Sequence, residues 1–182
     1  MDRFPPIPPD GYSAAQREDA LKLSAGPRGT VRGPFVPLLY SPALLQQTQL
    51  LGEYLRYHSA IPEPLREFAI LIAARHWRQA YEWHVHAPLA VKAGIPERLV
   101  DSLAVAAEPE PLTPDQALVY RFCRAVHDGG QVPEALFADA KQLLGDAGVI
   151  DLVGLCGYYA MLAMVLNVAQ TPVPGDPPNP FT

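Results

Sequence analysis

Apolar positions recur at intervals of three and four along most of the chain, which is the pattern of amphipathic helices. Leu44, Thr48, Leu51 and Leu55 illustrate this spacing on one helix face. No stretch shows the convincing alternation of apolar and polar residues that is typical of a strand. We therefore predict an all-α, single-domain helical bundle of about eight helices. The expected helices cover residues 13–25, 42–58, 62 to about 75, 81–94, 96–108, 114–128, 134–144 and 147–169.

Prolines and polar caps mark where several of these helices begin. Ser41-Pro42 is typical of a capping residue followed by a first-turn proline. Thr113-Pro114 has the same form, and Gln116 stands at the position that completes a capping box. Proline is favoured there because the first helical residues need no backbone N–H donor. These local signals fix the helix starts more firmly than the apolar pattern alone.

The remaining prolines, of 21 in all, gather at the two ends. Residues 1–12 and 171–182 are therefore expected to be extended arms around a core of about 25–170. Two arrangements fit this composition. The arms are either disordered, or they lie across a partner subunit and bury the apolar residues Phe4, Ile7, Val173 and Phe181.

Leu152–Ala169 is a run of 18 residues without a charged side chain, which is close to the length that a membrane span needs. It contains Gly154, Gly157 and Asn167, and no basic flank follows it. We expect a helix buried at the centre of the bundle or at a subunit interface, and no membrane contact.

Composition and charge exclude several classes of function. A net charge of −5 and a pI near 5.5 argue against nucleic-acid binding through a basic surface. Cys123 and Cys156 are the two cysteines, and no CxxC occurs, so a disulfide framework, a zinc ribbon and a CxxC redox centre are excluded. The first residues lack the apolar stretch of a secretory signal, which favours a cytoplasmic location.

Candidate chemistry is concentrated between residues 62 and 94. Glu67 precedes an uninterrupted apolar run, where a carboxylate must either lie at the helix edge or be buried with a partner. Glu82 and His86 are four residues apart and share one helix face. His84 is rotated by about 200° from His86 on a helix, so we predict no metal site built on the two histidines.

A structural interpretation of the same residues is open as well. Glu82 and His86 would then be a surface pair, and Trp77 and Trp83 would be anchors of the core or of an interface. The residues taken one at a time favour this interpretation slightly. Their combination favours a functional site.

The combination resembles the signature of the carboxymuconolactone decarboxylase family, within the alkylhydroperoxidase D-like superfamily. Glu67, Gln79, Glu82 and His86 stand at the spacing of that signature, and Gly94 follows it. Further similarities are Gly33-Pro34-Phe35, Ser41-Pro42, Tyr158-Tyr159 and Asn167, so the resemblance covers about residues 25–175. It implies an all-helical bundle whose subunits assemble into a homo-oligomer, commonly a trimer or hexamer.

The resemblance also indicates which residues carry the chemistry. In the peroxidase branch of the superfamily, the positions of Gln79 and Glu82 are two redox cysteines. Since these side chains have no thiol, we expect no thiol peroxidase activity. The family pairs the residues at the positions of Glu67 and His86 as a hydrogen-bonded acid–base pair.

From these points we expect an enzyme that needs no cofactor and acts on a small lactone or carboxylic acid. Its predicted activity is that of a carbon–carbon lyase, with His86 as proton donor, Glu67 orienting it and Glu82 as a second acid–base group. Arg75, Tyr81 and Trp83 are the expected substrate-binding residues. A decarboxylase of aromatic-compound catabolism fits the family. Two alternatives stay open, a related lactone hydrolase or isomerase and a non-catalytic ligand-binding or assembly protein.

Overall fold

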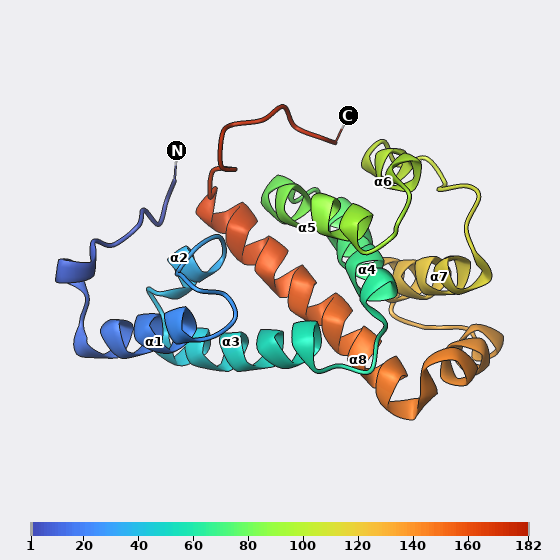
Figure 1. Cartoon of the computed structure of the whole chain (residues 1–182), viewed down its shortest axis with the longest axis horizontal. Coiled ribbons are helices and arrows are strands. Elements are labelled where there is room, and N and C mark those ends of the chain that lie inside the picture. Colours follow the sequence, from blue (N-terminus) through green and yellow to red (C-terminus); the bar gives the residue numbers. More distant parts are fainter. Residues whose placement is uncertain (1, 182) are drawn as a thin grey trace.

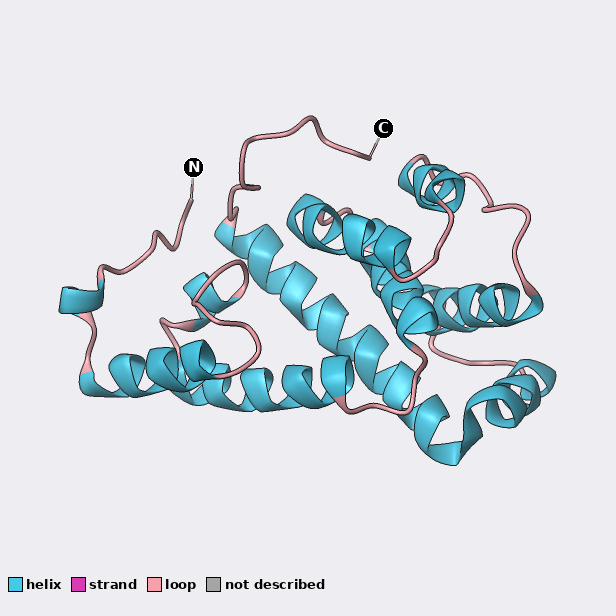
Figure 2. Ribbon diagram, in the orientation of Figure 1, coloured by secondary structure: helices cyan, strands magenta, loops and turns pink. Residues whose placement is uncertain are grey.

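The computed structural model describes residues 2–181, and within them every regular element is a helix (Figures 1 and 2). This confirms the predicted all-α class. The elements are a short 3-10 turn at Pro9–Gly11 and α1 (Ala14–Ala25), α2 (Phe35–Leu38), α3 (Pro42–Tyr57), α4 (Glu63–His76), α5 (Ala80–Lys92), α6 (Glu97–Ala104), α7 (Pro114–Asp128) and α8 (Glu134–Ala169).

Local signals place the helix starts where the sequence predicts them. Thr113 Oγ1 accepts a hydrogen bond from the Gln116 backbone, and the Gln116 side chain accepts one from the Thr113 backbone, which forms the expected capping box of α7. Pro42 stands in the first turn of α3. Such caps satisfy backbone donors that have no partner inside the helix.

The predicted helices 134–144 and 147–169 both form, and they follow one another as α8 with the expected break at Gly145 (φ 71°, ψ 175°), which bends its path (Figure 1). Glycine adopts this left-handed φ without the steric penalty of a Cβ atom. Two elements differ from the sequence-based expectation. The helix α6 ends at Ala104, four residues before its predicted end. The four-residue helix α2 was not predicted, because one helical turn is too short to show a periodic pattern.

α4 forms the centre of the bundle. It packs against α5, α7 and α8, and all of its residues from Glu67 to Ala74 are buried. A helix surrounded on every side needs apolar residues all round, which explains the continuous apolar run. Glu67, the polar residue at the start of this buried run, is therefore enclosed and needs a partner inside the protein.

α8 runs diagonally across the molecule between α3 and α4 and contacts both (Figure 1). By length and composition alone it could cross a membrane, and 56% of its most apolar window is buried inside the bundle. Its exposed large apolar side chains are Phe137 before the break and Ile150, Val153, Met164 and Val168 after it. The helix thus serves as a core helix and also leaves an apolar strip uncovered.

Both arms pack against their own chain. The Arg3 backbone N–H donates to Ala169 O at 2.8 Å, and the Phe4 ring packs edge-on against Tyr40. At the other end the Phe181 ring is buried against Trp83, and Arg78 donates to its carbonyl oxygen. In the structure, the two arms therefore cover part of the chain's own surface.

Candidate active site

A hairpin of α4 and α5 carries the candidate catalytic residues. Its turn contains Arg78, with φ 48°, and Gln79 caps α5 by accepting a hydrogen bond from the Tyr81 N–H. The Gln79 amide also donates to Asn167 Oδ1 on α8 at 2.7 Å, and the Asn167 amide donates to Trp77 O. Gln79 therefore joins the turn to α8.

The hairpin brings Glu67 on α4 against His86 on α5. His86 Nδ1 lies 2.7 Å from Glu67 Oε2, which confirms the predicted contact, and both side chains are buried. Burial works to raise the pKa of Glu67, but the hydrogen bond and charge of His86, with the charges of Arg56 and Arg66, outweigh burial and lower it. Glu67 is therefore ionised, and a carboxylate only accepts hydrogen bonds. Nδ1 must then carry a proton, which leaves Nε2 for the chemistry.

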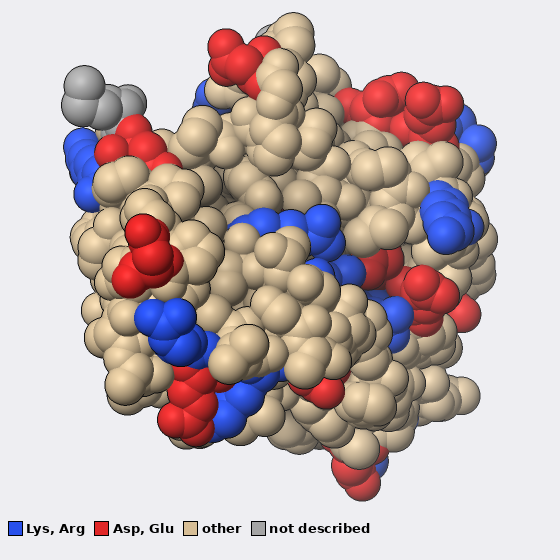
Figure 3. All heavy atoms as spheres, turned by 60° about the vertical axis from the view of Figure 1, so that its left-hand side comes forward, with Lys and Arg blue, Asp and Glu red and all other residues tan. Residues whose placement is uncertain are grey.

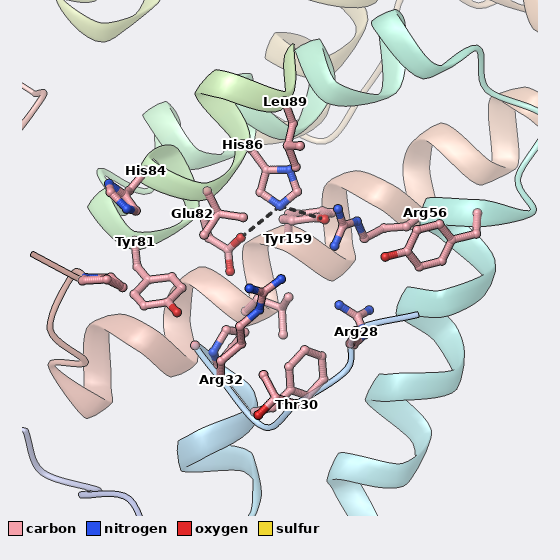
Figure 4. A pocket seen from close by; sticks show the side chains of 17 residues that line it. Arg28, Thr30, Arg32, Arg56, Tyr81, Glu82, His84, His86, Leu89 and Tyr159 are labelled. Atoms are coloured by element: carbon pink, nitrogen blue, oxygen red, sulfur yellow. Dashed lines mark hydrogen bonds and ion pairs between the residues drawn. The ribbon is translucent and has the colours of Figure 1, made fainter. Parts of the chain in front are cut away.

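Two further groups surround His86 Nε2. The Tyr159 hydroxyl lies 3.3 Å from it and Glu82 Oε2 lies 3.5 Å from it (Figure 4). Burial raises the pKa of Glu82 despite the nearby charges of His86, Arg56 and Arg28. Burial likewise raises the pKa of Tyr159 well above its ordinary value. Burial thus favours the protonated form of both groups that flank the nitrogen facing the cavity.

The cavity in front of Nε2 has a volume of about 630 Å³, which suits a small molecule. Its walls come from α5, from α3 and α8, and from the loop that joins α1 to α2. That loop approaches α5 at Gly33, which has φ 58°, and a Cβ atom there would lie 2.7 Å from the Tyr81 ring. Glycine at this position allows the loop to close one side of the cavity.

Three arginines that were not predicted line the cavity. Arg28 and Arg32 lie on the loop between α1 and α2, and Arg56 lies on α3 (Figure 4). Lys and Arg atoms also gather across the middle of the face shown in Figure 3. The overall charge of −5 thus conceals a locally basic cavity. The only signal in the sequence was the glycine-flanked segment around residues 26–33, which the resemblance covers without assigning a role.

The structure distributes the predicted substrate-binding residues differently from the expectation. Tyr81 lines the cavity. Arg75 lies outside it, because its Nε donates to Leu103 O and its guanidinium stacks on the Phe181 ring. Trp83 does not line the cavity either and packs against Phe181 instead. His84 lies at the exposed rim of the cavity, whereas His86 is buried, as the helical spacing predicts.

The two cysteines form a separate buried pair. Cys123 Sγ on α7 and Cys156 Sγ on α8 lie 3.6 Å apart, and neither residue lines the cavity. The pKa of Cys156 is lowered to about 6, chiefly by the hydrogen bond with Cys123. His127 lowers this pKa further, and burial acts to raise it. Within residues 2–181 no three His, Cys, Asp or Glu side chains are grouped as metal ligands.

Comparisons with known proteins add information on the fold. No sequence-family profile matches the chain, and no curated protein matches it. Among solved structures, the chain is similar to the alkylhydroperoxidase AhpD core of an uncharacterized peroxidase-related protein from Ralstonia eutropha JMP134. The TM-score is 0.74 at 14% sequence identity, over 96% of this chain and 93% of that chain. The chain therefore has an alkylhydroperoxidase D-like fold.

Proposed function

We propose that the protein is an enzyme of the carboxymuconolactone decarboxylase type, which uses acid–base chemistry at His86 on a small lactone or carboxylic acid. The observation that carries this proposal is the buried contact of 2.7 Å between Glu67 and His86 beside a cavity of about 630 Å³. A pair that only stabilises the fold needs no cavity in front of its free nitrogen.

The proposed reaction begins with loss of CO2 from a carboxylate. The electrons of the broken C–C bond pass into the conjugated lactone and form a dienolate. Protonated His86 donates its Nε2 proton to carbon and becomes neutral imidazole, and a proton from solvent restores it. Overall, carboxylate and one proton yield CO2 and the protonated product. Glu67 fixes the ring orientation through Nδ1 and stabilises the imidazolium.

Glu82 and Tyr159 would stabilise the dienolate. Both lie beside Nε2 and burial raises the pKa of both, which favours their protonated forms, and in those forms they can donate hydrogen bonds to a developing oxyanion. A donor in a buried site is more effective than the same donor in water. This arrangement also supports the related lactone isomerase, which needs the same enolate.

The test is proton nuclear magnetic resonance in D2O with a panel of small γ-lactone carboxylic acids. A decarboxylase releases CO2 and leaves deuterium at the protonated carbon. We expect His86→Gln to lower the rate by roughly 10²–10⁴-fold with the fold intact, as judged by circular dichroism. His84→Gln is the matched control on the same helix and should keep most of the rate. Equal and small losses for both variants would favour the non-catalytic binding protein.

A further inference from the structure

In the described part of the chain, no carboxylate lies within ion-pair distance of the three arginines of the cavity, although the charges of Glu67 and Glu82 act on Arg56 over a longer range. Arg28 contacts the Tyr158 hydroxyl at 3.4 Å and lies over the Phe35 ring, and Arg56 lies over the Tyr57 ring. None of the ion pairs within residues 2–181 includes Arg28, Arg32 or Arg56. Arginines on an open surface are readily hydrated, but two of these three are half-buried.

Burial makes the absence of partners informative. The Nε atoms of Arg28 and Arg56 are both inaccessible to solvent, and neither has a hydrogen-bond partner. Buried polar groups are nearly always satisfied, and a guanidinium stays protonated at every physiological pH. An anion in the cavity would meet the terminal nitrogens of the two guanidinium groups and neutralise their charge.

Glu82 does not fill this role. It is the one carboxylate side chain among the described residues of the cavity lining, it lies beside His86 Nε2, and it forms no ion pair with any of the three arginines. Glu67 is committed to His86 Nδ1. The cavity therefore carries an excess of positive charge that a bound ligand would neutralise.

We propose that Arg28 and Arg56 form a clamp for the carboxylate of a small organic anion, with Arg32 adding positive charge at the exposed side of the cavity. The planar guanidinium matches the two oxygens of a carboxylate. Apolar side chains of the same cavity, among them Phe35, Leu89 and Leu162, suit an organic body more than a bare inorganic ion. This assignment rests on the proposed function in one respect only, namely that the reacting part of the ligand lies next to His86.

The side chains in Figure 4 show how the clamp is oriented. The guanidinium groups of Arg28, Arg32 and Arg56 point into the space that Glu82 and Tyr159 border. Tyr158 supports one side of the clamp through its contact with Arg28. A carboxylate held there would bring the rest of the ligand towards His86 Nε2.

The test is isothermal titration calorimetry of the full chain at low ionic strength with benzoate, its uncharged isostere benzamide, and inorganic phosphate. Benzoate should bind at least 10-fold more tightly than benzamide and than phosphate. Arg28→Gln and Arg56→Gln should each weaken benzoate binding at least 10-fold. The exposed Arg98 on α6 provides the control, and Arg98→Gln should bind as the wild type does.

Several results would overturn the clamp. Equal binding of benzoate and benzamide, absence of benzoate binding, or tighter binding of phosphate would each do so. The comparison of the three probes uses the wild-type protein and needs no variant. If Arg56→Gln does not fold, Arg56→Lys tests the geometry of the clamp, because lysine keeps the charge but lacks the planar guanidinium. Benzoate binding is measured without turnover, so an inactive protein that retains the clamp contradicts the proposed function alone.

Discussion

Gly52 on α3 is the position where one added methyl group should disturb both the fold and the cavity. A Cβ atom there would overlap the Tyr158 hydroxyl and would lie 2.5 Å from a terminal nitrogen of Arg28. Tyr158 is buried on α8, and this burial raises its pKa to about 12. It cannot move aside without displacing its neighbours. We therefore expect Gly52→Ala to push Tyr158 and Arg28 away from α3.

The magnitude follows from three contributions to the free energy of unfolding. Overpacking a filled interior destabilises by about 1–3 kcal/mol. Loss of the Arg28–Tyr158 hydrogen bond removes about 1 kcal/mol more. Replacing a helical glycine by alanine returns about 0.5–1 kcal/mol. The net loss is about 2 kcal/mol, which for a chain of 182 residues corresponds to a fall in Tm of about 4–8 °C.

Thermal denaturation followed by circular dichroism measures this change. Gly157 on α8 offers a matched control, because it is also helical and an added Cβ atom meets nothing within 4 Å. Gly157→Ala should raise Tm by about 1–4 °C, the opposite sign for the same substitution. Gly52→Ala should also weaken benzoate binding. A Gly52→Ala protein with the wild-type Tm and wild-type benzoate affinity would refute the reasoning.

Three further predictions concern ionisation, redox chemistry and assembly. Burial favours the protonated form of Glu82 in the folded protein, so its contribution to stability is fully present below its ordinary pKa of 4.5 and is lost as pH rises through the raised folded pKa. The Tm of Glu82→Gln should therefore rise relative to the wild-type Tm as pH increases from 5 to 8. A difference in Tm that stays constant over this range would contradict the prediction. We expect no thiol-dependent turnover of hydroperoxides, because Cys123 and Cys156 are buried away from the cavity. Hydroperoxide turnover that Cys156→Ser abolishes would contradict this expectation. The uncovered apolar strip of α8, which includes Ile150 and Val168, predicts a homo-oligomer, and the family resemblance implies a trimer or hexamer; light scattering that gives 19.8 kDa would argue against assembly.

The sequence predicts best what depends on neighbouring residues. The capping box of Thr113 and Gln116 lies within a single turn, and its geometry needs no distant contact. The contact of Glu67 with His86 was predicted through the family resemblance, which supplied the spatial relation that spacing alone does not give.

The substrate-binding residues were harder to predict, for a physical reason. Arg75 is near Glu67 in sequence, but eight residues on a helix amount to about 80° of rotation and about 12 Å of rise. It therefore faces Leu103 and Phe181 instead of the cavity. Arg28 and Arg56 belong to separate segments, and only tertiary packing brings them to the cavity.

The loop between α1 and α2 approaches the α4–α5 hairpin at Gly33, which packs closely against Tyr81. The hairpin carries His86 and its carboxylates, whereas the loop and α3 carry the arginines. Exchange of residues 26–32 would therefore alter which ligand enters without rebuilding the group that moves the proton. The fold separates the choice of ligand from the reaction, so engineered variants of this one loop could redirect the site towards neutral or differently charged molecules.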